Sequence, residues 1–256
     1  MDLSALSVNF SAANLSAADF SATNFSGAVY RIVESQEKVA TMNLVDTLDE
    51  QLVLESLLDQ SKPVSSYGKP RHYLIYTPFR YPPLPHGSRF GSRFEPAIFY
   101  AGATLKSALC EAAFYSFYFM SRSKSPFNGV IMNHKTSFAV KVKDQYHIDL
   151  TTIKDEAMQA RLTSKTDYQY TQSVGRAMRN SDALSFSYRS ARCEQQVNVG
   201  IFDINAIVSD PFDTQHWQTK QSAEKIVFYC PMEPTQSLEF KRQDYLVGTE
   251  IPAPSV

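Results

Sequence analysis

Apolar residues recur at two spacings along the chain, and each spacing predicts a type of element. Leucines at positions 44, 48, 52 and 58 fall near one face of a helix with acidic residues between them, so residues 44–60 are predicted to form an amphipathic helix. Pro63 and Gly68 end this segment. By the same reasoning, further helices are predicted over Thr104–Met120, Asp155–Leu162 and Tyr170–Arg179.

Short runs of β-branched and aromatic residues predict strands. These runs cover Arg71–Thr77, Ala97–Ala101, Ser137–Val142, Ala183–Tyr188, Val197–Phe202, Lys225–Cys230 and Ser237–Phe240. The later strands follow one another without regular crossover helices between them. This order favours an α+β fold, with one compact domain around a mixed or antiparallel sheet, over a doubly wound sheet.

The first 28 residues differ from the rest of the chain. They repeat an Asn/Asp–Leu/Phe step every five residues, beginning at Asn9, Asn14, Asp19 and Asn24. Such pentapeptide repeats wind a β-helix in larger proteins, but this segment makes only about one coil, and solenoids need roughly three or more stacked units. A docking or capping arm and a flexible leader both fit the pattern, and its shortness favours the leader. We therefore divide the chain into a leader, residues 1–28, and a globular domain, residues 29–256.

Composition narrows the classes of function. The 256 residues include 25 Lys and Arg against 26 Asp and Glu, so no basic field is available for nucleic-acid binding by this chain alone. Cys110, Cys193 and Cys230 have no metal-ligand spacing and are expected to be free thiols in a reducing compartment. The N-terminus lacks a signal-peptide pattern, and charges interrupt the most apolar stretch, Ala97–Met120. These features predict a soluble cytoplasmic protein without a membrane segment.

Recognisable catalytic motifs are few. The sequence has no phosphate-binding loop, dinucleotide glycine fingerprint, nucleophile elbow or pair of histidines with zinc spacing, so we expect no metal centre. Glu111 stands out because small and apolar residues flank it in the predicted helix 104–120. Burying a carboxylate is costly unless it is paired or used in chemistry. A structural ion pair with a nearby arginine and a functional role both fit this pattern.

The segment from Pro78 to Pro96 is rich in proline, glycine, arginine and aromatic residues and is predicted to be a structured loop. It contains Arg80, Arg89 and Arg93 among aromatic rings. Guanidinium groups bind phosphate through paired hydrogen bonds, glycines let backbone N–H groups approach an anion, and aromatic faces stack on planar bases. A nucleotide-binding loop is one interpretation. The other is a surface loop held by arginine–carboxylate pairs, which spacing alone favours.

Several short motifs, taken in order, resemble those of the RES-domain proteins. They are Tyr30-Arg31, Gly87-Ser88-Arg89-Phe90-Gly91, Ile98-Phe99-Tyr100, Ala108-Leu109-Cys110-Glu111, Tyr188-Arg189-Ser190-Ala191-Arg192 and Asn198. The segment Thr77-Pro-Phe-Arg-Tyr-Pro-Pro-Leu ahead of Gly-Ser-Arg-Phe-Gly is typical of the longer subgroup of that family. The resemblance runs from about Tyr30 to at least Phe202 and leaves out the leader.

The resemblance implies a fold related to the ADP-ribosyltransferase toxins and the role of a toxin from a bacterial toxin–antitoxin pair. Such toxins deplete NAD⁺ by cleaving its nicotinamide–ribose bond, either with water as an NAD⁺ glycohydrolase or with inorganic phosphate as an NAD⁺ phosphorylase. NAD⁺ is then a substrate, and no cofactor is implied. Some relatives transfer ADP-ribose to a protein, which leaves a mono-ADP-ribosyltransferase as the alternative. The implied partner is an Xre-type helix-turn-helix antitoxin that covers the active-site cleft.

The matching motifs also imply roles for individual residues. Arg31 and Arg89 would contact the pyrophosphate, and Tyr100 would stack on nicotinamide or its ribose. Glu111 would stabilise the positive charge that develops on the ribose as the bond breaks. The sequence leaves the acceptor open among water, phosphate and a protein.

Three more residues complete the candidate site. Ser190 takes the place of the family serine, although many members have Pro-Ser where this chain has Tyr-Arg-Ser-Ala-Arg. Arg80 and Asn198 are further substrate-binding candidates. Two other classes of function stay open: a non-catalytic module that grips an anion through its arginine-rich loop, and a structural protein assembled through the leader. Glu111 argues against the first, because a pyrophosphate site has little use for another buried negative charge.

Overall fold

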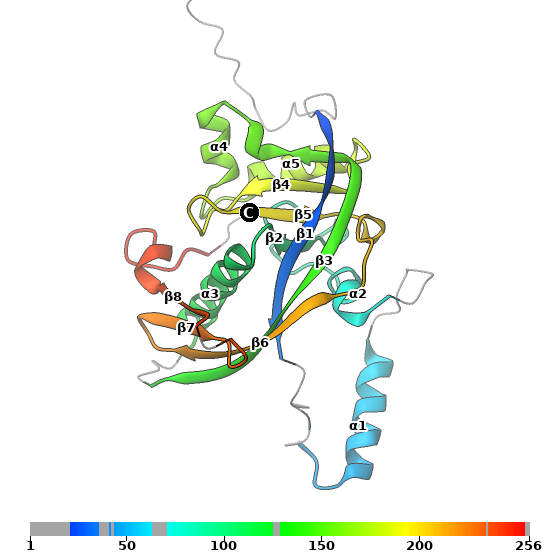
Figure 1. Ribbon diagram of the computed structural model, residues 1–256, viewed down its shortest axis with the longest axis vertical. Helices are drawn as coiled ribbons and strands as arrows, with labels where there is room; N and C mark the ends of the chain where they lie inside the picture. Colours follow the sequence, from blue (N-terminus) through cyan, green and yellow to red (C-terminus); the bar gives the residue numbers. More distant parts are fainter. Residues whose placement is uncertain are drawn as a thin grey trace, which may run out of the picture.

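The strands of the protein belong to a single sheet. The computed structural model describes residues 21–35, 41, 44–62, 71–124, 129–233 and 235–253. Within these ranges the sheet order is β1-β2-β5-β4-β3-β6-β7-β8, and all neighbours are antiparallel except β3 and β4 (Figure 1). The eight strands are β1 (Ala22–Glu34), β2 (Phe99–Gly102), β3 (Ile131–Asp149), β4 (Ser185–Arg189), β5 (Val197–Ile201), β6 (Phe212–Gln221), β7 (Lys225–Tyr229) and β8 (Ser237–Lys241).

Strand β3 organises this sheet. It pairs with β1 over most of that strand, with Val29 opposite Val140, and it also pairs with β4 near its C-terminal end and with β6 near its N-terminal end. Because β1 also pairs with β2, the pairings β1-β2-β5-β4-β3 return to β1 and form a closed ring. The buried side chains of Phe138, Val140 and Val142 join Val29 in one core cluster. The mixed, mainly antiparallel sheet in one compact domain confirms the α+β prediction.

Five helices accompany the sheet among the described residues. They are α1 (Leu48–Ser61), α2 (Tyr73–Arg80), α3 (Leu105–Ser121), α4 (Glu156–Leu162) and α5 (Gln169–Arg179). Side-chain caps mark the starts of α3 and α4. The Thr104 hydroxyl accepts a hydrogen bond from the Ser107 N–H at the start of α3, and the Asp155 carboxylate accepts one from the Met158 N–H at the start of α4. Both starts agree with the predicted helices.

Helix α3 carries Glu111 and packs against the sheet through a second core cluster. Its buried Leu109, Phe114 and Phe117 belong to one cluster with Trp217 of β6 and Phe228 of β7. A third cluster joins α4 and α5 to β4 and to Phe90 of the arginine-rich loop, and α4 and α5 lie together beside β4 in Figure 1. The elements that hold the candidate residues are therefore each anchored by buried apolar contacts.

The predicted strand Arg71–Thr77 is wrong, because these residues open helix α2. The His72 side chain accepts a hydrogen bond from the Leu74 N–H at 3.3 Å and caps the helix. Ile75 is fully buried, and Leu74 and Phe79 pack against the same core, so one helical face carries the apolar residues. Their β-branched and aromatic composition mimicked a strand in sequence.

The structure also moves the boundary of the leader. Residues 22–28, which fall in the predicted leader, form the first half of β1 and pair with β3. Phe25 stacks on His147 of β3 with ring centroids 4.4 Å apart. The repeats before Ser21 lie outside the described residues.

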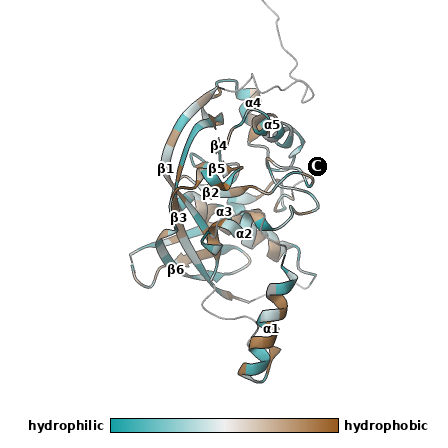
Figure 2. Cartoon of the chain, turned by 90° about the vertical axis from the view of Figure 1, so that its right-hand side faces the viewer, coloured by the Kyte–Doolittle hydropathy of each residue, from teal (hydrophilic) through white to brown (hydrophobic). Residues whose placement is uncertain are grey.

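Helix α1 confirms the predicted helix 44–60 in outline. Its apolar side chains are not covered by the described residues, since Leu48, Leu52, Val53 and Leu57 are all more than half exposed. Figure 2 shows brown, apolar stretches along α1, which stands apart from the sheet. Among the described residues, no helix combines the length and apolar character needed to cross a membrane.

A histidine buried between strands forms a polar network away from the candidate site. His147 Nδ1 lies 2.8 Å from Ser185 Oγ, its Nε2 lies 2.8 Å from Ser187 Oγ, and Ser185 Oγ donates to Asp144 at 2.7 Å. Because the Ser185 hydroxyl proton points to Asp144, Nδ1 must donate to Ser185 and a neutral ring accepts from Ser187 through Nε2. Burial lowers the pKa of His147, and Asp144 and Asp149 oppose this effect.

Stability is expected to fall as the pH drops below about 6.5, the ordinary histidine pKa. The unfolded chain takes up a proton at His147 there, while the folded state resists it, so acid favours unfolding. The free energy of unfolding, measured by denaturant titration between pH 8 and pH 5, checks this. His147→Gln should show a shallower decline than the natural protein, and equal slopes would contradict the assignment.

Candidate active site

Glu111 is held by two neutral donors, one from strand β5 and one from the turn between β4 and β5. It lies in the second turn of α3, and its Oε1 accepts hydrogen bonds from Ser190 Oγ at 2.8 Å and from Asn198 Nδ2 at 2.7 Å. Asn198 belongs to β5, is buried, and its Oδ1 accepts from Ser107 Oγ of the same helix. Both contacts use the same carboxylate oxygen, so the orientation of Glu111 is fixed without an ion pair among these contacts. The structural ion pair considered from sequence is therefore not what holds this carboxylate.

Ser190 occupies the turn between β4 and β5 and has its hydroxyl fully engaged. Its Oγ accepts from the backbone N–H groups of Arg192 at 3.1 Å and Cys193 at 3.0 Å while donating to Glu111. The Ser190 N–H donates to the Gln196 carbonyl at 2.8 Å, which closes the turn. A hydroxyl with these three partners positions the carboxylate and keeps its own proton directed at it.

Tyr100 lies in β2 and connects the sheet to the arginine-rich loop. Its hydroxyl lies 2.9 Å from Ser88 Oγ and accepts from the Phe90 N–H at 3.0 Å. Burial raises the pKa of Tyr100 to about 12, so the hydroxyl stays protonated at neutral pH. The ring is 6.5 Å from that of Tyr188, two residues before Ser190. Tyr188 thus bridges the Tyr100 and Ser190 parts of the site.

Arg31 reaches the same region from β1. Its Nη1 donates to the Tyr100 carbonyl at 2.6 Å, and its guanidinium carbon lies 4.8 Å from the centre of the Phe99 ring. Burial lowers the pKa of Arg31 to about 10, and Tyr115 opposes this, so the group remains cationic at neutral pH. Its buried Nε has no hydrogen-bond partner among the described residues. The cation therefore retains a donor that an anionic ligand could use.

The other arginines of the predicted loop differ in their surroundings, and Arg80 belongs to the last turn of α2, so the loop begins after it. Arg89 is buried, donates through Nη1 to the carbonyls of Leu162 at 3.3 Å and Ser164 at 2.7 Å, and lies 4.6 Å from the Tyr168 ring centre. These contacts tie the loop to the end of α4, and its pyrophosphate contact stays a prediction. Arg80 lines a hollow beside α2, close to the ring of Tyr76.

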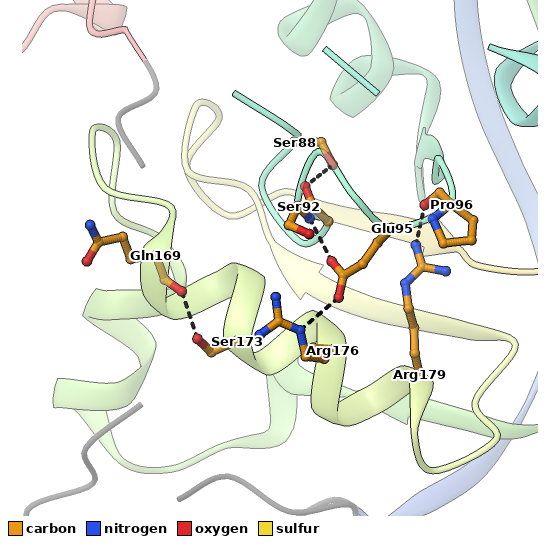
Figure 3. Close-up of polar contacts among 9 residues, drawn as sticks. Ser88, Ser92, Glu95, Pro96, Gln169, Ser173, Arg176 and Arg179 are labelled. Carbon is orange, nitrogen blue, oxygen red and sulfur yellow. Dashed lines mark hydrogen bonds and ion pairs between the residues drawn. The ribbon is translucent and has the colours of Figure 1, made fainter. Parts of the chain in front are cut away.

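The far side of the loop is pinned to α5, as Figure 3 shows. Glu95 accepts from the Ser92 N–H at 2.7 Å and from Arg176 Nε at 3.0 Å, and Arg179 Nη2 donates to the Pro96 carbonyl at 2.7 Å. The loop is thus held by an arginine–carboxylate pair, as one of the two interpretations requires. Its other side, through Ser88 and Phe90, still holds Tyr100.

Two hollows contain several of the other candidate residues. One, of about 770 Å³, is lined by Arg31, Arg80, Ser88 and Tyr100 among others. The second, of about 810 Å³, is lined by Ser190 and Arg192 among others. Both volumes fall in the range of small-molecule sites, which is roughly 300–1,000 Å³. The candidate residues are therefore divided between two hollows, and Glu111, which lines neither, is bonded to Ser190 of the second.

Arg192 and Tyr115 join the site without having been assigned a role from sequence. Arg192 is buried, lies 3.8 Å from the Phe114 ring centre and donates through Nη2 to the Lys165 carbonyl at 2.9 Å. Its buried Nη1 has no partner within the described part of the chain. Tyr115 follows Glu111 by one helical turn and is half exposed. The Tyr-Arg-Ser-Ala-Arg motif already contained Arg192, but only its packing distinguishes it from Arg189.

Comparison with known families settles the relationship that these motifs suggested. A family model described as "RES domain" matches residues 65–220, which is more than half of the chain. The chain belongs to the RES-domain family. The matched part of the RES domain includes Tyr100, Glu111, Ser190 and Asn198, whereas Arg31 precedes it and joins the site through the pairing of β1 with β3. No curated protein matches the chain.

Proposed function

We propose that this RES-domain protein cleaves the nicotinamide–ribose bond of NAD⁺. The observation that carries the proposal is the state of Glu111, a carboxylate oriented through Oε1 alone by Ser190 and Asn198. Its Oε2 receives no hydrogen bond from the described residues, so that oxygen retains its capacity to accept one. A fixed negative charge of this kind stabilises positive charge that develops in a transition state.

The chemistry follows from the leaving group. The nicotinamide nitrogen is cationic, so the glycosidic bond breaks with its electron pair moving to that nitrogen and leaves an oxocarbenium-like ribose. Glu111 stabilises this charge and accepts hydrogen bonds from the ribose hydroxyls, by the logic of a glycosidase carboxylate. Water or inorganic phosphate then bonds to the anomeric carbon, and the acceptor's proton passes to solvent.

Two guanidinium groups support binding of the pyrophosphate. Arg31 in the first hollow and Arg192 in the second each retain a buried N–H group without a partner among the described residues, and a phosphate oxygen satisfies such a donor well. Tyr100, neutral and fixed by two hydrogen bonds, offers an aromatic face beside Arg31. Holding the pyrophosphate keeps the ribose from drifting away from Glu111.

The cellular role rests on the family alone. Destruction of NAD⁺ in the cell that makes the enzyme requires a neutralising partner, so we propose that the protein is the toxin of a toxin–antitoxin pair. Its partner is then an Xre-type helix-turn-helix protein that covers the cleft, and both act in the cytoplasm.

Loss of NAD⁺ in a purified preparation tests this function. We expect NAD⁺ to disappear as nicotinamide is released. Chromatography monitors both compounds over time, with and without inorganic phosphate. A phosphate-dependent rate identifies a phosphorylase, and a phosphate-independent rate identifies a glycohydrolase. NAD⁺ labelled in its adenylate half distinguishes transfer to a protein from degradation of NAD⁺, because label retained on protein indicates an ADP-ribosyltransferase. Binding without turnover by folded protein, free of any partner, would contradict the proposal.

A further inference from the structure

The fold brings two cysteines together beside Glu111. Cys110 directly precedes Glu111 on α3, and Cys193 lies in the turn that carries Ser190. Cys110 Sγ lies 3.7 Å from the Arg192 carbonyl, whose carbon is bonded to the Cys193 nitrogen. Cys110 is a buried member of the α3 core cluster, and Cys193 is partly buried and packs against the same cluster. Cys230 belongs to the same cluster but is at the end of β7.

The two thiols differ in exposure and in acidity. Cys110 is buried, and its hydrogen bond with Cys193 together with burial raises the pKa of its thiol. Cys193 is partly exposed, and its hydrogen bond with Cys110, assisted by the positive charge of Lys106, lowers the pKa of its thiol. The thiolate is the reactive form of cysteine, so the partly exposed Cys193 is the member of the pair that reacts first with an oxidant.

We propose that Cys110 and Cys193 form a reversible intramolecular disulfide when hydrogen peroxide oxidises them. The Cys193 thiolate attacks one peroxide oxygen, which breaks the O–O bond, gives a sulfenic acid and releases water after protonation. Cys110 then attacks the Cys193 sulfur, forms the S–S bond and releases a second water. The two thiols lose two electrons and the peroxide gains them, and a dithiol reductant reverses the reaction. Disulfides of this transient kind are the type found in reducing compartments.

The consequence for the site follows from the hydrogen bonds of the turn. Disulfide sulfurs lie about 2.05 Å apart, much closer than two thiols in a hydrogen bond. Bond formation therefore draws Cys193 toward α3, and the Cys193 N–H is bonded to the Ser190 oxygen that positions Glu111. A displacement of about 1 Å in such a group can cost roughly 100-fold in rate. This part rests on the proposed NAD⁺ cleavage, and we expect the oxidised protein to be at least about tenfold slower.

Peptide mapping of the full-length protein tests the disulfide directly. The protein is treated with hydrogen peroxide, its remaining thiols are alkylated, and tryptic peptides are identified by mass spectrometry. We expect peptide 107–122 cross-linked to peptide 193–220, with Cys230 alkylated in peptide 226–241. Dithiothreitol should release the cross-link. The Cys230→Ala variant should give the same product, whereas Cys110→Ser should stop at oxidised Cys193.

The outcomes separate this proposal from the proposed function. Cross-links through Cys230, cross-links between two chains, or oxidation of Cys193 without a partner in the natural protein would each overturn the disulfide. If the reduced protein does not cleave NAD⁺, the proposed function fails while the peptide map still decides the disulfide. If the disulfide forms and the oxidised protein cleaves NAD⁺ as fast as the reduced protein, the cysteine pair does not control the site.

Discussion

Replacement of Glu111 by glutamine is expected to slow NAD⁺ cleavage by about 100-fold or more. The amide has the shape of the carboxylate and can still accept through its oxygen from Ser190 and Asn198, so the fold should persist. What is lost is the negative charge that faces the developing positive charge on the ribose. The measurement is the initial rate of nicotinamide release at saturating NAD⁺, because a transition-state contact lowers kcat and not only binding.

A matched substitution far from the site controls for loss of charge alone. Glu239 lies on β8 and forms an exposed ion pair with Lys225 at 2.8 Å. Glu239→Gln removes one carboxylate and should leave the rate unchanged, since exposed pairs contribute little. Glu111→Gln protein with the natural thermal stability and the natural rate would show that this carboxylate takes no part in the reaction.

The hydrophobic pattern predicted elements well where apolar residues make the buried face. Helices α3, α4 and α5 and strands β4, β5, β7 and β8 lie within a few residues of their predicted ranges. Strand β6 was not predicted, because its buried face alternates Trp217 with the polar Thr219 and Gln221. Strand β1 was not predicted either, and in its first half Ser, Ala and Asn in a five-residue repeat hide the two-residue period.

The residues of the candidate site were predictable as types, but their contacts were not. Motifs singled out Glu111, Ser190 and Asn198, yet only the adjacency of β2, β5 and β4 brings them together, with Asn198 opposite both Gly102 and Tyr188. Such pairings depend on the whole sheet order and leave no local signal in sequence. The proximity of Cys110 and Cys193 could not be predicted for the same reason, because the sequence spacing of the three cysteines indicates no contact between any two of them.

Replacement of Gly175 by alanine should give the largest loss of stability among the substitutions considered. A Cβ on this residue of α5 would lie 1.8 Å from the Phe90 carbonyl oxygen and 2.7 Å from its carbon, and neither backbone atom can rotate away. Overpacking of this kind costs about 3 kcal/mol at its upper range, even though alanine favours a helix by about 1 kcal/mol over glycine. Denaturant unfolding measures the loss.

The clash at residue 175 would push the Phe90 backbone away from α5. This shift should reach the site, because the Phe90 N–H donates to the Tyr100 hydroxyl. We therefore expect Gly175→Ala to slow NAD⁺ cleavage as well as to destabilise the fold. Ser173→Ala in the same helix is the control: its hydroxyl only bonds the Gln169 carbonyl at 3.0 Å, and the change should stay within about 0.5 kcal/mol. If Gly175→Ala instead gained stability by the helix preference alone, α5 would not press on the loop that holds Tyr100.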